Sequence, residues 1–186
     1  MNENGIKKDE TRVLAVLTLD KPGVLERIAG VIRRRGCNIY SLTVGPSEVP
    51  GYSRFTILVS GVDSVLLQSI AQQIEKLIDV IRSEDITDQR LVMSELALLK
   101  LEASPDQLNK ILGVLGPHRV RVLDTRESMI VLEATGDARE IDSVVAILRG
   151  LGLTIVKRSG AIAVITGKTH PEFATPQFVV GVRSDP

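Results

Sequence analysis

The hydrophobic positions in the first half of the chain switch between strand spacing and helical spacing. Continuous or alternating apolar residues predict strands, and apolar residues that recur every three or four positions predict helices. The predicted elements are, in order, a strand over about 12–19, a helix over about 23–35, strands over about 38–46 and 52–60, a helix capped by Asp63 and a strand from Val80. This order is βαββαβ.

The second half repeats this order with different residues. The predicted elements are a strand over about 94–102, a helix opened by residues 104–107, strands over about 118–125 and 128–135, a helix from Asp137 and a strand over about 154–165 that is interrupted at 158–160. Ser104 and Gln107 have the spacing of a capping box, with Pro105 at the first helical position, where its missing N–H costs no hydrogen bond. Asp137 and Glu140 have the same spacing.

Two consecutive βαββαβ units predict an α+β protein made of two ferredoxin-like domains. Each domain is expected to pack two helices on one face of an antiparallel four-stranded sheet, and the other face is expected to be covered by another sheet or chain. The predicted division is a polar N-terminal tail over 1–10, a first domain over 11–88, a second domain over 89–170 and a tail over 171–186. The two domains join near 87–90.

The turn between the first strand and the first helix has the composition of a ligand loop. It reads Asp20-Lys21-Pro22-Gly23, and glycine lacks a Cβ that would hold a ligand away from the backbone. The helix that begins there presents unpaired N–H groups and a partial positive charge, which suits a small carboxylate. An ordinary strand-to-helix turn also favours Asp, Pro and Gly, so the tetrapeptide alone leaves both interpretations open.

Charge and cysteine content narrow the classes of function. The chain has 23 basic and 23 acidic residues, so it lacks the overall positive field of a dedicated nucleic-acid-binding protein, and the run Arg33-Arg34-Arg35 is interpreted as a solvated helix end. Cys37 is the single cysteine, which fits a reducing compartment and an inert thiol among apolar neighbours. The absence of a long apolar run or a signal peptide predicts a soluble, cytoplasmic protein with no membrane partner.

The motifs of common catalytic and binding sites are incomplete. Gly167-Lys168-Thr169 resembles the end of a phosphate-binding loop, but Ile162 stands where that loop needs a glycine. The two histidines, His118 and His170, lack other ligands at metal-binding spacing, so neither a metal site nor a catalytic residue is predicted. An RNA-recognition domain is disfavoured, because aromatic residues make up only 3% of the chain and the third strand lacks the stacking motif.

Four sequence blocks in the first domain resemble the amino-acid-binding ACT domain. They are Asp-Lys-Pro-Gly-Val-Leu at 20–25, Arg-Gly-Cys-Asn-Ile at 35–39, Ser-Leu-Thr-Val-Gly-Pro at 41–46 and Ser-Arg-Phe-Thr-Ile at 53–57. Together they are similar to the regulatory small subunit of acetohydroxyacid synthase, also called acetolactate synthase. The similarity continues at 76–80, 95–100 and 158–160. The second domain is accordingly expected to be ACT-like.

The resemblance implies a non-catalytic regulatory subunit. Such a subunit binds the catalytic (large) subunit, activates it and confers feedback inhibition by branched-chain amino acids, chiefly valine. The resemblance implies no cofactor on this chain, whereas thiamine diphosphate, Mg²⁺ and FAD belong to the catalytic partner. It also implies a homodimer through the ACT domains, in which two four-stranded sheets join side by side.

The resemblance also implies the residues of the effector site. The effector is expected between the loop of one chain and a segment of the other, so the predicted effector-binding residues are Asp20, Pro22, Gly23, Val24 and Leu25 from the loop and Asn38 and Ile39 from the second strand. Thr43 and Arg54 are assigned to partner contacts. The first strand and residues 38–44 are expected at the edge of the sheet where the two copies meet.

Two departures from the family pattern affect these expectations. Asp20 stands where the family usually has asparagine, and a carboxylate there would attract the effector's ammonium group and repel its carboxylate. Residues 116–120 differ from the usual passage between helix and strand in the second domain. The alternative hypothesis is a tandem-ACT amino-acid sensor that regulates gene expression.

Overall fold

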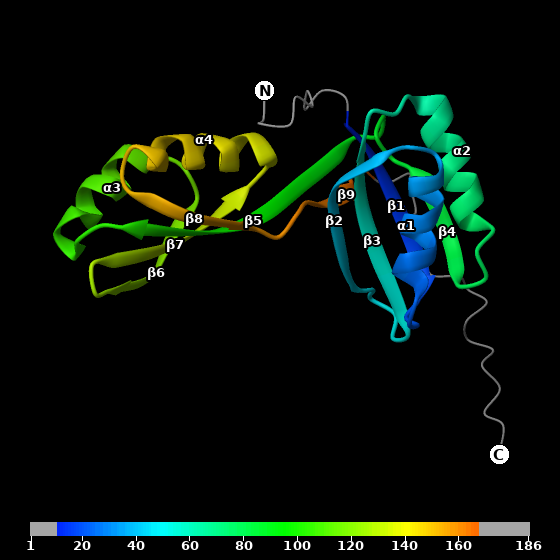
Figure 1. The fold of residues 1–186 in the computed structure, drawn as a ribbon, viewed down its shortest axis with the longest axis horizontal. Helices are drawn as coiled ribbons and strands as arrows, with labels where there is room; N and C mark the ends of the chain where they lie inside the picture. The colour runs from blue at the N-terminus through cyan, green and yellow to red at the C-terminus, as the bar shows by residue number, and fades with distance from the viewer. Residues whose placement is uncertain (1–10, 168–186) are drawn as a thin grey trace, which may run out of the picture. The chain divides into compact units, whose positions relative to one another are not determined.

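A computed structural model describes residues 11–167 of the 186-residue chain. Contacts divide the described residues into two compact units, one of residues 11–92 with 164–167 and one of residues 93–163. Each unit combines an antiparallel sheet with two α-helices on one of its faces (Figure 1). The predicted α+β class with two ferredoxin-like units is therefore confirmed. None of the helices in the described part of the chain has the length and apolar content that a membrane crossing requires.

The first unit follows the predicted order of elements. Its elements are β1 (Thr11–Leu19), α1 (Val24–Arg34), β2 (Asn38–Pro46), β3 (Tyr52–Ser60), α2 (Ser64–Glu75) and β4 (Val80–Asp85). The strand order is β2-β3-β1-β4, so β2 and β4 are the edge strands. The expectation that β1 lies at an edge-to-edge dimer contact is wrong, because β1 pairs with β3 on one side and β4 on the other.

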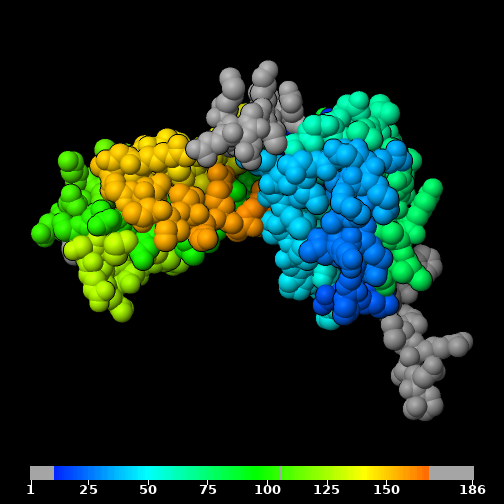
Figure 2. Space-filling model, in the orientation of Figure 1, coloured from blue at the N-terminus to red at the C-terminus, as the bar shows by residue number. Residues whose placement is uncertain are grey.

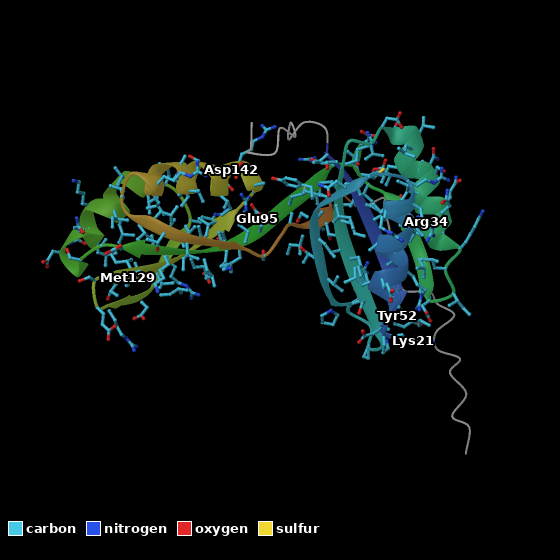
Figure 3. The ribbon with its side chains drawn as sticks, in the orientation of Figure 1. Lys21, Arg34, Tyr52, Glu95, Met129 and Asp142 are labelled. Carbon is cyan, nitrogen blue, oxygen red and sulfur yellow. The ribbon has the colours of Figure 1, made fainter. Side chains whose placement is uncertain are left out.

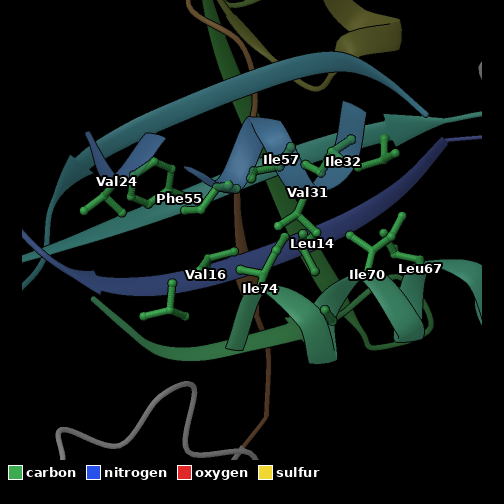
Figure 4. Packing of buried hydrophobic residues seen from close by; sticks show 14 residues of the cluster. Leu14, Val16, Val24, Val31, Ile32, Phe55, Ile57, Leu67, Ile70 and Ile74 are labelled. Atoms are coloured by element: carbon green, nitrogen blue, oxygen red, sulfur yellow. The ribbon is translucent and has the colours of Figure 1, made fainter. Parts of the chain in front are cut away.

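The core of the first unit lies between its helices and one face of its sheet (Figure 4). Helix α1 contributes Ile28 and Ile32, and α2 contributes Leu67, Ile70 and Ile74, all of them fully buried. These residues recur at helical spacing, which is why one stripe of each helix packs on the sheet. Burying such an aliphatic side chain is worth about 1.5–3 kcal/mol, so this stripe holds both helices against the sheet.

The opposite faces of the two sheets differ in their exposure. In β1 the residues that point away from the helices, Val13, Ala15 and Leu17, are at most 8% exposed. In the second unit Leu98 and Ile155 point away from the helices and are 40% and 43% exposed. Both sheets therefore carry apolar side chains on the face away from their helices, as expected, and the covering of these faces by another sheet or chain stays a prediction.

The second unit also follows the predicted order. Its elements are β5 (Leu91–Glu102), the 3₁₀ turn η2 (Pro105–Gln107), α3 (Leu108–Leu115), β6 (Val120–Arg126), β7 (Met129–Gly136), α4 (Ala138–Arg149), β8 (Leu153–Arg158) and β9 (Ile162–Ile165), of which β5 and β9 extend past the bounds of the unit. The strand order is β6-β7-β5-β8, and β9 also pairs with β5. The predicted last strand is divided into β8 and β9, as the interruption at 158–160 indicated.

The predicted helix caps hold in two cases and in part in a third. Asp63 accepts a hydrogen bond from the Leu66 N–H at 2.7 Å, and Asp137 forms a complete capping box with Glu140. At the third position Gln107 Oε1 accepts from the Ser104 N–H at 2.9 Å, but the first turn is a 3₁₀ turn and α3 begins only at Leu108. The helix predicted to begin at residues 104–107 therefore begins later, because the first turn hydrogen-bonds at shorter range.

Candidate functional site

The loop between β1 and α1 adopts a conformation that depends on Gly23. This residue has φ 81° and ψ −2°, a left-handed conformation that glycine adopts without steric cost. The Asp20 N–H donates to the Gly51 carbonyl at 2.8 Å, and the Lys21 N–H donates to the Leu19 carbonyl at 3.1 Å. Hydrogen bonds from within the chain thus hold the loop in place.

Helix α1 begins at this loop without a side-chain cap. Its first intrahelical hydrogen bond runs from the Arg27 N–H to the Gly23 carbonyl at 3.2 Å, so the N–H groups of the preceding residues have no partner inside the helix. The helix dipole adds a partial positive charge at the same place. This end of α1 therefore has the donors and the charge that a carboxylate requires.

Of the predicted loop residues, some present side chains and others only their backbone. Asp20 and Pro22 are exposed, and Leu25 is 42% exposed. Val24 is 4% exposed and belongs to the hydrophobic core, so its side chain is not accessible and its backbone N–H is the group that it offers.

Asn38 and Ile39 begin strand β2 and lie beside α1. Asn38 is exposed, whereas Ile39 packs against the core of the first unit. An open groove of about 780 Å³ runs between α1 and this strand and is lined by Glu26, Arg27, Ala29, Gly30, Ile32, Arg33, Arg34, Cys37, Asn38 and Ile39. Helix α1 and the start of β2 lie on the same visible face in Figure 2.

The two predicted halves of the effector site lie at opposite ends of α1. The helix has 11 residues, which corresponds to a length of about 16 Å. Lys21 precedes Val24, the first residue of this helix, whereas its last residue, Arg34, is close to Asn38 in sequence; Lys21 and Arg34 are labelled in Figure 3. A single copy of the chain therefore does not bring the loop and Asn38 to one small amino acid.

A cluster of charged side chains lies next to the loop, and none of the sequence motifs indicates it. Arg27 in the first turn of α1 donates to the Asp79 carboxylate, and the Lys21 ammonium nitrogen lies 3.3 Å from the same carboxylate. Asp79 is only 6% exposed, and its carbonyl accepts a hydrogen bond from the Leu19 N–H at 2.8 Å. Asp79 follows α2, and no local sequence signal connects it with the loop.

The two residues assigned to partner contacts lie on neighbouring strands. Thr43 of β2 is paired with Thr56, and its hydroxyl is buried without a hydrogen-bond partner among the described residues. Arg54 of β3 forms two hydrogen bonds with Glu48 at 2.9 and 2.5 Å. Arg54 lowers the pKa of the Glu48 carboxyl through these bonds. Both residues are therefore already engaged in the structure of the first unit or buried in it.

The cysteine and the histidine that the structure describes do not form a common site. Cys37 is half-buried, and burial raises the pKa of its thiol while nearby Arg35 opposes that shift. His118 lies in a turn, with Nε2 3.5 Å from the Ser143 hydroxyl. Within residues 11–167 no group of three or more His, Cys, Asp or Glu side chains is placed to hold a metal ion. Lys168, Thr169 and His170 lie outside the described residues.

Two family models and several relatives match most of the chain. The family described as "AHAS small subunit-like ACT domain" matches residues 14–82, and the family "Small subunit of acetolactate synthase" matches residues 94–167. A probable acetolactate synthase small subunit of Methanothermobacter thermautotrophicus is 39% identical over 159 residues, which are 85% of this chain and 94% of that protein. The chain belongs to the acetolactate synthase small-subunit family.

Other members of the small-subunit family match this chain over most of its length, and one solved structure has the same fold. The acetolactate synthase small subunit of Bacillus subtilis is 34% identical over 156 residues, which cover 84% of this chain and 91% of that protein. The crystal structure of the acetolactate synthase small subunit from Thermotoga maritima aligns with a TM-score of 0.74 and 28% identity, covering 85% of this chain and 98% of that one. The family assignment favours the regulatory-subunit hypothesis over the regulator of gene expression.

Proposed function

We propose that the chain is a non-catalytic regulatory subunit that binds the catalytic subunit of acetolactate synthase and raises its activity. In this proposal it also confers feedback inhibition by branched-chain amino acids, with valine as the main effector. Thiamine diphosphate, Mg²⁺ and FAD belong to the catalytic partner. The support for this role is the match of both units to small-subunit families and the names of the full-length relatives.

The main support for the effector site is the start of α1 at Gly23, which has no side-chain cap. The same unit has an edge strand, β2, that is open to pairing with a second copy. The loop lies at the end of the sheet where β2 finishes. Pro46 is paired with Ser53, Ser53 is paired with Thr18, and the Asp20 N–H donates to the Gly51 carbonyl in the adjacent turn. The last residues of β2 and the loop therefore belong to one end of the first unit.

A two-fold axis that pairs two β2 edges in antiparallel fashion completes the site. With the axis near the middle of the strand, Asn38 of one copy lies opposite Pro46 of the other, at the loop end of the sheet. The effector carboxylate then meets the N–H groups of α1 from one copy. Its ammonium group meets the Asn38 side-chain amide of the other copy, which supplies a carbonyl acceptor. This arrangement requires a dimer, since one copy holds the two halves apart.

The proposed function is tested by measuring acetolactate formation by a cognate catalytic subunit with and without the purified full-length chain. We expect no acetolactate from the chain alone, a several-fold higher rate of the catalytic subunit in its presence, and inhibition of that rate by valine. An unchanged rate with each plausible catalytic subunit would refute the role. Sedimentation at micromolar concentration should show a dimer or a larger assembly, and a stable monomer that binds valine would refute the shared site.

A further inference from the structure

Three charged side chains behind the glycine loop have no part in the site proposed above. Asp79, in the turn that follows α2, receives Arg27 on one carboxylate oxygen and Lys21 on the other, the latter at 3.3 Å. Its backbone carbonyl accepts from the Leu19 N–H at the end of β1. One residue thus connects the end of β1, the loop and the first turn of α1.

Asp79 is buried, whereas the two cations that pair with it are partly exposed. The side chain of Asp79 is 9% exposed, whereas those of Arg27 and Lys21 are 40% and 58% exposed. A buried carboxylate is costly unless cations or N–H groups pair with it, so this carboxylate holds a cation in a fixed position. Arg27 is the better fixed of the two cations, because its backbone is already part of α1.

The position of Arg27 relative to Gly23 directs it toward the proposed ligand. Its Nη1 lies 3.4 Å from the point where a Cβ on Gly23 would be, so the guanidinium lies against the glycine. It donates to Asp79 through Nη2, and a guanidinium has five N–H donors in a planar fork. Nη1 therefore lies beside Gly23, the N-cap residue of α1, at the end of the helix where the effector carboxylate is proposed to bind.

We infer that Arg27 is an effector-binding residue that pairs with the carboxylate of the amino acid, and that Asp79 is the residue that positions it. The inference rests on the proposed function and deepens it, since it makes the site selective for ligands that carry a carboxylate. Arginine suits this task because its fork matches the two oxygens of a carboxylate.

The same cluster bears on the repulsion expected between the Asp20 carboxylate and the effector carboxylate. Asp20 and Asp79 bring two negative charges to the loop, and Lys21 and Arg27 bring two positive charges. Glu26 in the first turn of α1 adds a third negative charge, so the cluster as a whole is not neutral, but the effector carboxylate meets the Arg27 cation directly at Gly23. The aspartate remains available to attract the effector's ammonium group.

The test compares the binding of two probes, L-valine and L-valinamide, to the full-length chain by isothermal titration calorimetry. The probes share the ammonium group and the side chain, but valinamide lacks the negative charge. We expect the wild-type chain to bind valine at least tenfold more tightly than valinamide. The Arg27→Gln variant should lose most of this difference in affinity. Asp79→Asn should reduce the preference by a smaller factor, since Arg27 stays but loses its fixed position.

A matched control separates this effect from the general loss of a charge. Arg121→Gln removes an arginine that pairs with Glu133 at 3.1 Å in the second unit, and it should leave the preference for valine unchanged. Melting temperatures show whether each variant folds. If Arg27→Gln does not fold, Arg27→Lys replaces it, and that variant should keep the charge but show a weaker preference for valine because it lacks the fork.

The outcomes distinguish this inference from the proposed function. If the wild-type chain binds valine and the folded Arg27 variant keeps the wild-type preference for valine over valinamide, the inference is overturned and the proposed function stands. If the wild-type chain, alone or with its catalytic partner, binds none of valine, leucine and isoleucine, the proposed function fails. A loss of preference in the Arg27 variant, but not in Arg121→Gln, supports the inference.

Discussion

Replacing Gly23 with aspartate should abolish feedback inhibition while leaving activation of the catalytic partner largely intact. The new carboxylate would stand at the start of α1, where the effector carboxylate is proposed to meet the N–H groups. It would also lie next to Arg27, since a Cβ at Gly23 is already 3.4 Å from that guanidinium. The substituted side chain would therefore occupy both groups that the effector needs.

The size of the effect follows from the interactions that are lost. Hydrogen bonds to a charged group contribute about 1.5–3 kcal/mol, which corresponds to a loss of affinity of about 10- to 150-fold. Repulsion between the two carboxylates adds to this loss. A non-glycine residue in the left-handed conformation costs a further 1–2 kcal/mol of folding stability, roughly, and aspartate is among the residues that tolerate it best.

Gly61→Asp is the matched control for strain and charge. Gly61 has φ 69°, close to the 81° of Gly23, and a Cβ there meets no atom within 4 Å. Both variants should melt at similarly reduced temperatures, but only Gly23→Asp should lose inhibition in acetolactate assays with valine, leucine and isoleucine. Unchanged inhibition in Gly23→Asp would place the effector site elsewhere. Loss of activation in Gly23→Asp alone would mean that the loop itself docks on the catalytic subunit.

Three further predictions concern other parts of the chain. Asn38→Ala should weaken inhibition by valine less than Gly23→Asp does, because it removes a polar partner without adding a repulsive charge; an equal or larger effect would contradict this. Arg158→Ala should lower the free energy of unfolding by about 3 kcal/mol in denaturant titrations, since it leaves Glu95, which is 7% exposed, without its cation. Cys37 should react with iodoacetamide at pH 8 more slowly than a free cysteine, because its raised pKa leaves less thiolate; a faster reaction would contradict the assigned shift.

The sequence predicts the first unit well because its signals are local. Strands β2 and β3 begin and end where the apolar patterns and the turn residues around 47–51 indicate. The cap at Asp63 follows from its position before an apolar helix. The first turn of the second unit is less predictable, since Gln107 can close either a 3₁₀ turn or an α-helical turn with Ser104 and the sequence does not choose between them.

The charged cluster could not be predicted in the same way. Arg27 and Asp79 are 52 residues apart in the sequence. They meet because β4 pairs with β1, and this pairing places Asp79, the residue before β4, next to the loop that follows β1. Without that pairing, both residues look like ordinary charges on a helix and in a turn. The hydrophobic pattern of β1 also does not reveal that it is an inner strand, because strand order depends on long-range pairing.

The way the loop is held has a consequence for regulation in the proposed dimer. Asp20, Leu19 and Arg27 are each fixed by hydrogen bonds to other parts of the first unit, so binding has little of the loop left to order. In the proposed dimer the missing half of the site is Asn38 of the partner subunit, so we expect effector affinity to depend on whether two β2 edges are joined. Because linkage is reciprocal, an effector that binds the dimer but not the monomer also stabilises the dimer against dissociation. Valine affinity should therefore fall as the chain is diluted below its dimer dissociation constant, and valine should shift sedimentation toward the dimer.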